Sequence, residues 1–236
     1  MNALIVFTIA GGLLVDQHWA RYGQVAVSAA AWLVFASLWV RCAAAERPAL
    51  IACLAFATAG EAFLSLAWGL YEYRLGNIPW FVPPGHVLLF FLGMRIAERI
   101  PAGGEWWIAL LAAPVVAAFA WNGRDTLGPL LYALFIACML ASPSRRLYAT
   151  MFVLSLAMEL YGTWIGNWTW AAQVPWLGLT AANPPIAAGA FYCVLDLLVV
   201  SVAGKARGRA YPASPGRNPS VASHQAATCS ARSSSR

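Results

Sequence analysis

Two carboxylic acids stand inside apolar stretches of this chain. Glu61 is flanked by Ala-Thr-Ala-Gly and Ala-Phe-Leu-Ser, and Glu159 by Leu-Ala-Met and Leu-Tyr-Gly. An acid in a membrane-spanning helix is costly, so it usually faces a bundle interior or a cavity. A carboxylic acid kept protonated by apolar surroundings can act as a general acid at neutral pH. The alternative is a structural role, in which each Glu only hydrogen-bonds a neighbouring side chain such as Tyr161, Ser65 or Thr163.

The same short pattern follows both acids. A Gly-x-aromatic-x-aromatic segment comes seven or eight residues after the Glu, then a β-branched residue with Pro-Trp, then a double proline that opens another apolar run. The first copy of the pattern runs from Gly69 to Pro84 and the second from Gly166 to Pro185. This repeated order predicts a duplicated membrane unit with one Glu in each copy.

Aromatic side chains crowd both copies of the pattern. An aromatic belt at the membrane interface would explain their number. Their repeated spacing also fits a hydrophobic mouth whose π faces hold a polyene or stabilise a carbocation. On this second interpretation the substrate-binding aromatic residues are Trp68, Tyr71, Tyr73, Trp168 and Trp170, with Trp80 and Trp176 nearby.

Three more polar residues are candidates for the site. Asp196, in Val-Leu-Asp-Leu-Leu, is a third candidate catalytic acid; it either pairs with Arg95, at the matching place in the first copy, or is a solitary acid near the inner interface. His86 follows a Pro-Pro-Gly sequence and either contacts a substrate or caps a helix. Asn183 precedes the second double proline, where we expect an N-cap, and it is included among the candidate substrate-binding residues.

The composition predicts an all-α, polytopic membrane protein. Hydrophobic residues make up 61% of the 236 residues and charged residues 10%, with a mean hydropathy of +0.66. Soluble domains carry about 25% charged residues, so a soluble chain of this composition would lack polar surface. The five cysteines show neither CxxC nor metal-ligand spacing, and there is no GxGxxG, DxxxD or histidine cluster. We therefore expect no cofactor and no metal.

The net charge of +6 belongs to the C-terminal segment. Residues 204–236 hold six Lys or Arg and no acid, whereas residues 1–203 hold nine Arg and nine Asp or Glu. A segment rich in Ser, Ala, Pro and Arg cannot bury enough apolar area to fold. We expect a membrane bundle over 1–203 and a disordered, basic cytoplasmic tail over 204–236, attracted to anionic lipid and not to nucleic acid.

Loop charges orient the predicted bundle. Seven or eight spans are expected, depending on whether the first and sixth apolar runs cross fully. With both termini in the cytoplasm, the inner loops and tail carry twelve Lys or Arg and the outer loops three, as the positive-inside rule requires of an inner-membrane protein. The apolar runs fall near residues 2–15, 22–41, 48–70, 83–97, 106–121, 127–142, 147–166 and 184–203.

The two copies of the pattern occupy the third and fourth runs and the seventh and eighth runs. An offset of four spans gives both copies the same topology, as in parallel repeats related by an axis along the membrane normal. We therefore expect two parallel four-helix halves, about 1–100 and 105–203. Both aromatic segments would lie in outer loops, with the two Glu at similar depth.

Short motifs within 61–95 and 155–200 carry a family resemblance. Glu61, Gly-x-Tyr-x-Tyr and Ile-Pro-x-x-Val-Pro at 61–83 resemble the integral-membrane carotenoid hydratases. Gly166-Asn-Trp-Thr-Trp, Asn183-Pro-Pro-Ile and Phe191-Tyr192 are similar to the small lycopene cyclase domains. Those cyclases carry paired Glu after the proline, where this chain has Ala187-Ala188. The resemblance implies acid chemistry on an isoprenoid C=C bond, with Glu61 or Glu159 serving in place of that pair.

The leading hypothesis is therefore a cofactor-independent membrane enzyme for cyclisation, hydration or isomerisation of a carotenoid-like substrate. Its partners would be a lipophilic small molecule and membrane lipid. The alternative is a non-enzymatic carrier or accessory protein, whose Glu residues couple to protons or hold helices together. An enzyme would bring both Glu to a closed cavity that opens sideways to lipid, whereas a carrier would show a polar path across the membrane.

Overall fold

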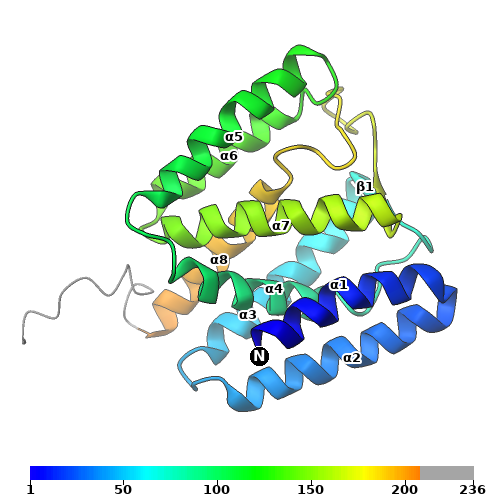
Figure 1. The fold of residues 1–236 in the computed structure, drawn as a ribbon, viewed down its shortest axis with the longest axis vertical. Helices are drawn as coiled ribbons and strands as arrows, with labels where there is room; N and C mark the ends of the chain where they lie inside the picture. The colour runs from blue at the N-terminus through cyan, green and yellow to red at the C-terminus, as the bar shows by residue number, and fades with distance from the viewer. Residues whose placement is uncertain (208–236) are drawn as a thin grey trace, which may run out of the picture.

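The computed structural model describes residues 1–207, and this part of the chain is mostly helical (Figure 1). Short links join eight α-helices in the described residues, and a π-helical segment and two three-residue strands complete them. The α-helices are α1 (Asn2–His18), α2 (Ala20–Arg41), α3 (Arg47–Glu61), α4 (Val82–Ala97), α5 (Gly104–Trp121), α6 (Gly128–Ala141), α7 (Arg145–Ile165) and α8 (Gly189–Arg207). The π-helical segment is η1 (Ala62–Ala67), and the strands are β1 (Tyr71–Tyr73) and β2 (Trp168–Trp170).

Four helices form the centre of the molecule. α3 packs on α4 and α8, and α7 packs on the same two helices, so the four close into a ring. The α1–α2 hairpin packs against α4 and α7, and the α5–α6 hairpin packs against α7 and α8 on the other side (Figure 1). The central ring therefore consists of α3 and α7, which carry Glu61 and Glu159, and of α4 and α8, which pack against both.

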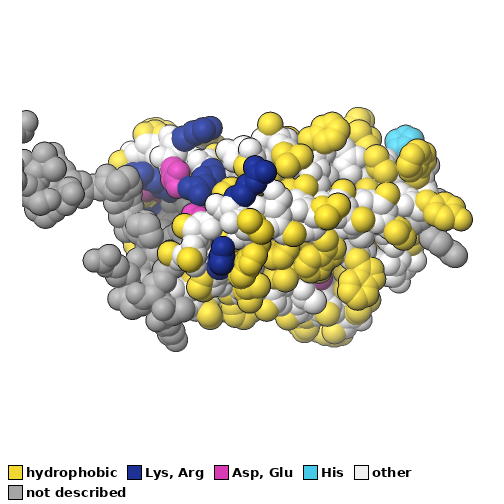
Figure 2. All heavy atoms as spheres, turned by 90° about the horizontal axis from the view of Figure 1, so that it is seen from below, with side chains coloured by type: hydrophobic (Ala, Val, Ile, Leu, Met, Phe, Trp, Pro, Cys, Tyr) yellow, Lys and Arg dark blue, Asp and Glu magenta, His cyan; other side chains and the backbone are white. Residues whose placement is uncertain are grey.

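Three helices in the described part of the chain are long and apolar enough to cross a membrane. They are Tyr22–Arg41, Arg47–Ala67, which includes η1, and Gly104–Trp121. Figure 2 shows hydrophobic side chains over most of one face of the molecule, with Lys and Arg gathered toward the end where α8 finishes. Apolar surface on this scale marks contact with lipid or with another protein.

The C-terminal helix is longer than the sequence predicted. α8 ends at Arg207, so the first four residues of the predicted tail, 204–207, continue the helix. The helix therefore ends four residues later than the predicted boundary of the bundle at residue 203. The remaining tail residues, 208–236, lie outside the described residues.

The two double prolines have different roles. Pro83 and Pro84 lie in the first turn of α4, as predicted, where a missing N–H and a fixed φ favour a helix start. Pro184 and Pro185 instead lie in an irregular segment ahead of α8, which begins only at Gly189. The prediction that Asn183 caps this helix was therefore wrong.

Other contacts hold residues 183–188 out of the helix. The Asn183 side-chain Oδ1 accepts a hydrogen bond of 2.9 Å from the Trp170 N–H. The buried Asp125 carboxylate accepts from the Ile186 N–H, at 2.6 Å, and from the Gly128 N–H, at 2.9 Å. These contacts anchor the segment to β2 and to the start of α6, and the Ile186 N–H finds its acceptor without a helical turn.

The two Gly-x-aromatic-x-aromatic segments form one antiparallel ribbon. Gly69 and Gly166 each take a positive φ, 73° and 87°, which turns the chain from the preceding helix into the strand. In the ribbon Tyr71 lies opposite Trp170, Glu72 opposite Thr169, and Tyr73 opposite Trp168. Since side chains alternate along a strand, the four aromatic rings share one buried face, and Glu72 and Thr169 point to the exposed face.

Candidate functional site

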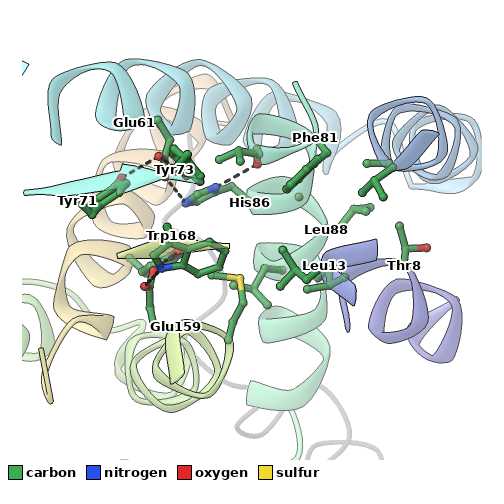
Figure 3. Close-up of a pocket in the computed structure, with 18 residues that line it drawn as sticks. Thr8, Leu13, Glu61, Tyr71, Tyr73, Phe81, His86, Leu88, Glu159 and Trp168 are labelled. Carbon is green, nitrogen blue, oxygen red and sulfur yellow. Dashed lines mark hydrogen bonds and ion pairs between the residues drawn. The ribbon is translucent and has the colours of Figure 1, made fainter. Parts of the chain in front are cut away.

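The buried face of the ribbon covers two carboxylates. Glu61, the last residue of α3, is 6% exposed. Its Oε2 accepts hydrogen bonds of 2.7 Å from the Tyr71 and Tyr73 hydroxyls (Figure 3). Burial first, and then the nearby Glu61 carboxylate, raise the pKa of both phenols well above their usual range. Both tyrosines are therefore neutral donors to Glu61.

Glu159 has a matching set of donors. It lies on α7 and is also 6% exposed. The indole N–H groups of Trp168 and Trp170 donate to its Oε2 at 2.8 and 3.1 Å. The Tyr192 hydroxyl, from α8, donates to its Oε1 at 3.0 Å. Each strand of the ribbon thus supplies two donors to the carboxylate of its own copy of the sequence pattern.

His86 and Tyr192 connect the two carboxylates. His86 lies on α4 with its Nε2 3.4 Å from the Glu61 Oε1, and its Nδ1 lies 3.1 Å from the Val82 carbonyl oxygen. The His86 and Tyr192 rings are stacked, with centroids 4.9 Å apart and planes inclined by 6°. Because Tyr192 also donates to Glu159, the stacked His86 and Tyr192 rings lie between the two carboxylates, each ring in polar contact with one of them.

Two apolar cavities meet at this polar centre. The first, about 60 Å³, lies between α1, α2, α4 and α7, and the second, about 340 Å³, lies between α3, η1, α6 and α8. Outside the wall that the two cavities share, the lining side chains are aliphatic or aromatic, except for Thr8 in the first cavity. That shared wall consists of Glu61, Tyr71, His86, Glu159 and Tyr192.

The larger cavity reaches the apolar exterior. Phe63 on η1 and Leu198 on α8 both line it, and they are 49% and 44% exposed. Both belong to the hydrophobic outer surface, so this cavity adjoins exposed apolar side chains. A π-helical segment forms part of the wall, and such segments frequently occur at functional sites.

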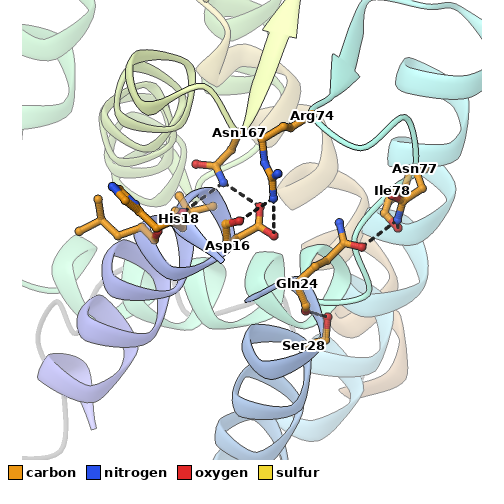
Figure 4. Close-up of polar contacts among 10 residues, drawn as sticks. Asp16, His18, Gln24, Ser28, Arg74, Asn77, Ile78 and Asn167 are labelled. Atoms are coloured by element: carbon orange, nitrogen blue, oxygen red, sulfur yellow. Dashed lines mark hydrogen bonds and ion pairs between the residues drawn. The ribbon is translucent and has the colours of Figure 1, made fainter. Parts of the chain in front are cut away.

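A second polar cluster fixes the ribbon to α1 (Figure 4). The buried Asn167 donates through Nδ2 to the Leu13 carbonyl oxygen at 3.1 Å and to the Asp16 Oδ2 at 2.8 Å. Arg74 Nη2 lies 3.4 Å from the Asp16 Oδ1, and the Arg74 N–H donates to the Asn167 carbonyl oxygen at 2.9 Å. Asn167 and Arg74 directly adjoin the two strands, so this cluster holds the ribbon over the carboxylates.

Most of the predicted site residues come together in this centre. The structure brings into contact Glu61, Glu159, His86, Tyr71, Tyr73, Trp168 and Trp170. The four ribbon aromatics are not an open mouth in a loop, because each is 8% exposed or less. Tyr192 was missed: Phe191-Tyr192 carried the family resemblance, but nothing in the local pattern indicated that its hydroxyl reaches Glu159.

Of the other predicted site residues, one lines the larger cavity and two lie elsewhere. Trp68 lines the larger cavity, and its ring stacks on that of Trp176 with the ring centroids 5.7 Å apart. Asn183 lines neither cavity and anchors β2 instead. Asp196 is fully buried, lines neither cavity, and neither of its carboxylate oxygens has a hydrogen-bond partner among the described residues.

The suggested pair of Asp196 and Arg95 was wrong. The Arg95 guanidinium instead lies 3.1 Å from Glu46 and 3.4 Å from Glu98. Arg95 lies in the last turn of α4 and reaches Glu46, which directly precedes α3, and Glu98, which directly follows α4.

The side chains suggested as structural partners of the two Glu also bond elsewhere. Tyr161 donates to the Ala10 carbonyl oxygen, Ser65 to the Tyr71 carbonyl oxygen, and Thr163 to the backbone oxygen of Glu159. The carboxylate donors come from the ribbon and from α8, which local spacing along a helix does not reveal.

Residues 1–207 contain no group of three or more His, Cys, Asp or Glu arranged to hold a metal ion. Comparison of the chain with protein-family models, with curated proteins and with solved structures found no match. The function is therefore inferred from the chemistry of the site.

Proposed function

We propose that this chain is an integral membrane enzyme that carries out acid-catalysed cyclisation, hydration or isomerisation at a C=C bond of a lipophilic, isoprenoid-like molecule. Glu61 and Glu159 are the candidate catalytic carboxylates, and His86, Tyr71, Tyr73, Trp168 and Trp170 surround the reacting bond. Asp196 lies outside this centre and has no part in the proposed reaction.

One observation carries the proposal. Two buried carboxylates, each with hydrogen-bond donors supplied by the protein, stand at the junction of two apolar cavities. Apolar walls favour a hydrocarbon substrate, and a polar centre within them is where a proton can be delivered to a C=C bond. The π faces of Tyr71 and Trp170, whose ring centroids are 4.8 Å apart, would attract positive charge that develops there.

The proposed substrate enters from the lipid. The exposed Phe63 and Leu198 at the larger cavity support a sideways entry, which is the feature expected of an enzyme rather than of a carrier. A carrier requires a polar path across the membrane, whereas the cavity walls beyond the shared centre are apolar.

The proposed membrane arrangement keeps seven or eight spans with both termini in the cytoplasm. The α1–α2 hairpin contacts α4 and the α5–α6 hairpin contacts the equivalent helix α8, and these contacts support two four-helix halves. So does the ribbon, in which equivalent segments of the two halves pair.

The proposed reaction class, acid chemistry at a C=C bond, is the one that the resemblance to carotenoid hydratases and small lycopene cyclase domains implies. Those cyclases use paired Glu where this chain has Ala187-Ala188. The proton would therefore come from the centre around Glu61 and Glu159.

The test is a comparison of lipid extracts from cells that make lycopene, with and without this chain, by mass spectrometry. A product of unchanged mass and altered retention indicates cyclisation or isomerisation, and a product heavier by one water indicates hydration. Membranes incubated with lycopene in D₂O should place deuterium on a product carbon. Glu61→Gln and Glu159→Gln are tested beside the unaltered chain. Full activity in both variants, or no product from any chain, would favour the carrier or accessory function.

A further inference from the structure

We propose that the two carboxylates have different roles in the reaction. Glu61 together with His86 holds the proton that is transferred, and Glu159 is a fixed anion that stabilises the resulting cation. This inference rests on the proposed function, and it is argued from the number and type of hydrogen-bond donors that each carboxylate receives.

The position of the transferable proton follows from the two contacts of His86 (Figure 3). The Val82 carbonyl oxygen can only accept, so the contact of 3.1 Å places a hydrogen on the His86 Nδ1. The other ring nitrogen, Nε2, faces the Glu61 Oε1 at 3.4 Å. We place the transferable proton between these two atoms, where it would make either an imidazolium beside a carboxylate or a neutral imidazole beside a carboxylic acid.

The tyrosines restrict that proton to the histidine side of Glu61. The Tyr71 and Tyr73 hydroxyls both donate to Oε2, which fills the two lone pairs of that oxygen. A proton on Glu61 must then reside on Oε1, toward His86 and the cavities. Tyrosine hydroxyls also accept hydrogen bonds, so the donors of Glu61 can exchange protons with a water molecule.

Two of the three donors to Glu159 cannot take a proton back. An indole N–H only donates, and Trp168 and Trp170 fill both lone pairs of the Glu159 Oε2. The Tyr192 hydroxyl donates to Oε1. Three hydrogen bonds donated to one carboxylate favour its charged form. In this proposal Glu159 supplies the preorganised negative charge at the wall of both cavities, of the kind that stabilises charge developing in a transition state.

The proposed step is balanced within this centre. The alkene π electrons form a C–H bond with the shared proton, and the pair is left as neutral His86 beside the Glu61 carboxylate. The adjacent carbon becomes a cation near Glu159. In hydration a water molecule then adds to that carbon and returns a proton to the pair. In cyclisation a neighbouring double bond adds, and the pair takes up the proton lost from carbon.

A lipophilic cation tests the anion directly. Dodecyltrimethylammonium mimics a cation with an apolar arm, and dodecanol is its uncharged counterpart. In phosphatidylcholine nanodiscs, monitored by tryptophan fluorescence, Glu159→Gln should weaken ammonium binding about tenfold to a hundredfold, as expected for loss of a buried charge partner. Glu61→Gln should change it less than about threefold, because the Glu61–His86 pair is neutral overall. Dodecanol binding should stay the same in both variants.

Deuterium transfer tests the proton donor. With lycopene in D₂O, Glu61→Gln should abolish carbon deuteration, and His86→Gln should slow it by about two orders of magnitude or more. Glu159→Gln should slow turnover while each product molecule still carries deuterium. Glu72→Gln is the matched control, since Glu72 lies on the exposed face of the same ribbon, and it should keep full turnover.

Nitrogen NMR of the unaltered, ¹⁵N-histidine-labelled chain gives a readout that needs no folded variant at this site. The His86 signals should show a protonated Nδ1 and an Nε2 that shares a hydrogen. A His86 Nε2 without a hydrogen-bonded proton, or loss of ammonium binding in Glu61→Gln but not in Glu159→Gln, would overturn the assignment. Either outcome would contradict the separate roles of the two carboxylates but not the proposed function. Full turnover in both Gln variants would contradict the proposed function.

Discussion

Tyr71 and Trp170 lie opposite each other in the ribbon, yet their side chains bind different carboxylates. Tyr71 donates to Glu61 and Trp170 to Glu159, with their ring centroids 4.8 Å apart. A single strand pair therefore sets the positions of both acids relative to each other. The way this ribbon is held leads to three predictions, and a fourth concerns the membrane orientation.

Gly162→Ala should displace Trp168 from its carboxylate. A Cβ on Gly162 would lie 2.0 Å from the Trp168 Cη2, so the indole must move and its bond to Glu159 must lengthen. Overpacking of this kind costs about 1–3 kcal/mol, and we expect a lower midpoint of thermal unfolding in detergent together with a loss of turnover.

Gly11→Ala is the control for this change. The nearest atoms to its Cβ are in the Phe7 ring at 3.8 Å, an ordinary contact. Removing a helical glycine there should leave stability unchanged or raise it by up to about 1 kcal/mol. If Gly162→Ala unfolds at the same temperature as Gly11→Ala, Trp168 is not seated against α7.

Asn167→Ala should loosen the contact between α1 and the ribbon. The change removes the donor to the buried Asp16 and to the Leu13 carbonyl oxygen, and an acceptor left unsatisfied costs about 1–3 kcal/mol. Chemical unfolding in detergent measures the loss. Asn77→Ala is the comparison, because Asn77 makes an exposed bond to Gln24 and should change stability by no more than about 0.5 kcal/mol. Equal effects of the two substitutions would argue against the cluster around Asp16.

A disulfide should form across the exposed face of the ribbon. Glu72 and Thr169 are directly opposite, and Cβ atoms in such pairs are about 4.5–5.5 Å apart. Glu72→Cys with Thr169→Cys should crosslink on mild oxidation, seen as a mobility shift that reductant reverses. The four described native cysteines are buried and should not compete. Glu72→Cys with Ala172→Cys, three residues out of register, should crosslink poorly; equal yields would contradict the register.

Cysteine labelling in cells should report the membrane orientation. A membrane-impermeant maleimide should reach Asn77→Cys and Gln173→Cys in intact cells. Both positions lie in predicted outer loops, directly before the fourth and the eighth predicted spans. Ala102→Cys, in the link between α4 and α5, should react only after permeabilisation. All three positions are at the exposed surface of the described chain. Labelling of Ala102→Cys in intact cells would reverse the proposed orientation, and labelling of all three would show that the spans do not cross.

The sequence alone was sufficient to locate the acids and the class of fold. Glu61 and Glu159 stood out because an acid among apolar residues is costly unless it has a role, and that cost is visible in the local sequence. The helical class and the start of α4 at its double proline likewise depend on local periodicity and on the backbone of proline. Such properties belong to a few consecutive residues, so no partner needs to be known.

Only the tertiary structure decided what surrounds the acids. The pairing of Tyr71–Tyr73 with Trp168–Trp170 joins segments far apart in the chain, and strands of three residues carry no periodicity strong enough to predict it. The stacking of Tyr192 on His86 and the capture of Asn183 by β2 also depend on how α4, α7 and α8 pack. Hydrogen-bond donors for a buried carboxylate are selected by distance in space, and that distance is determined by the packing of the whole bundle.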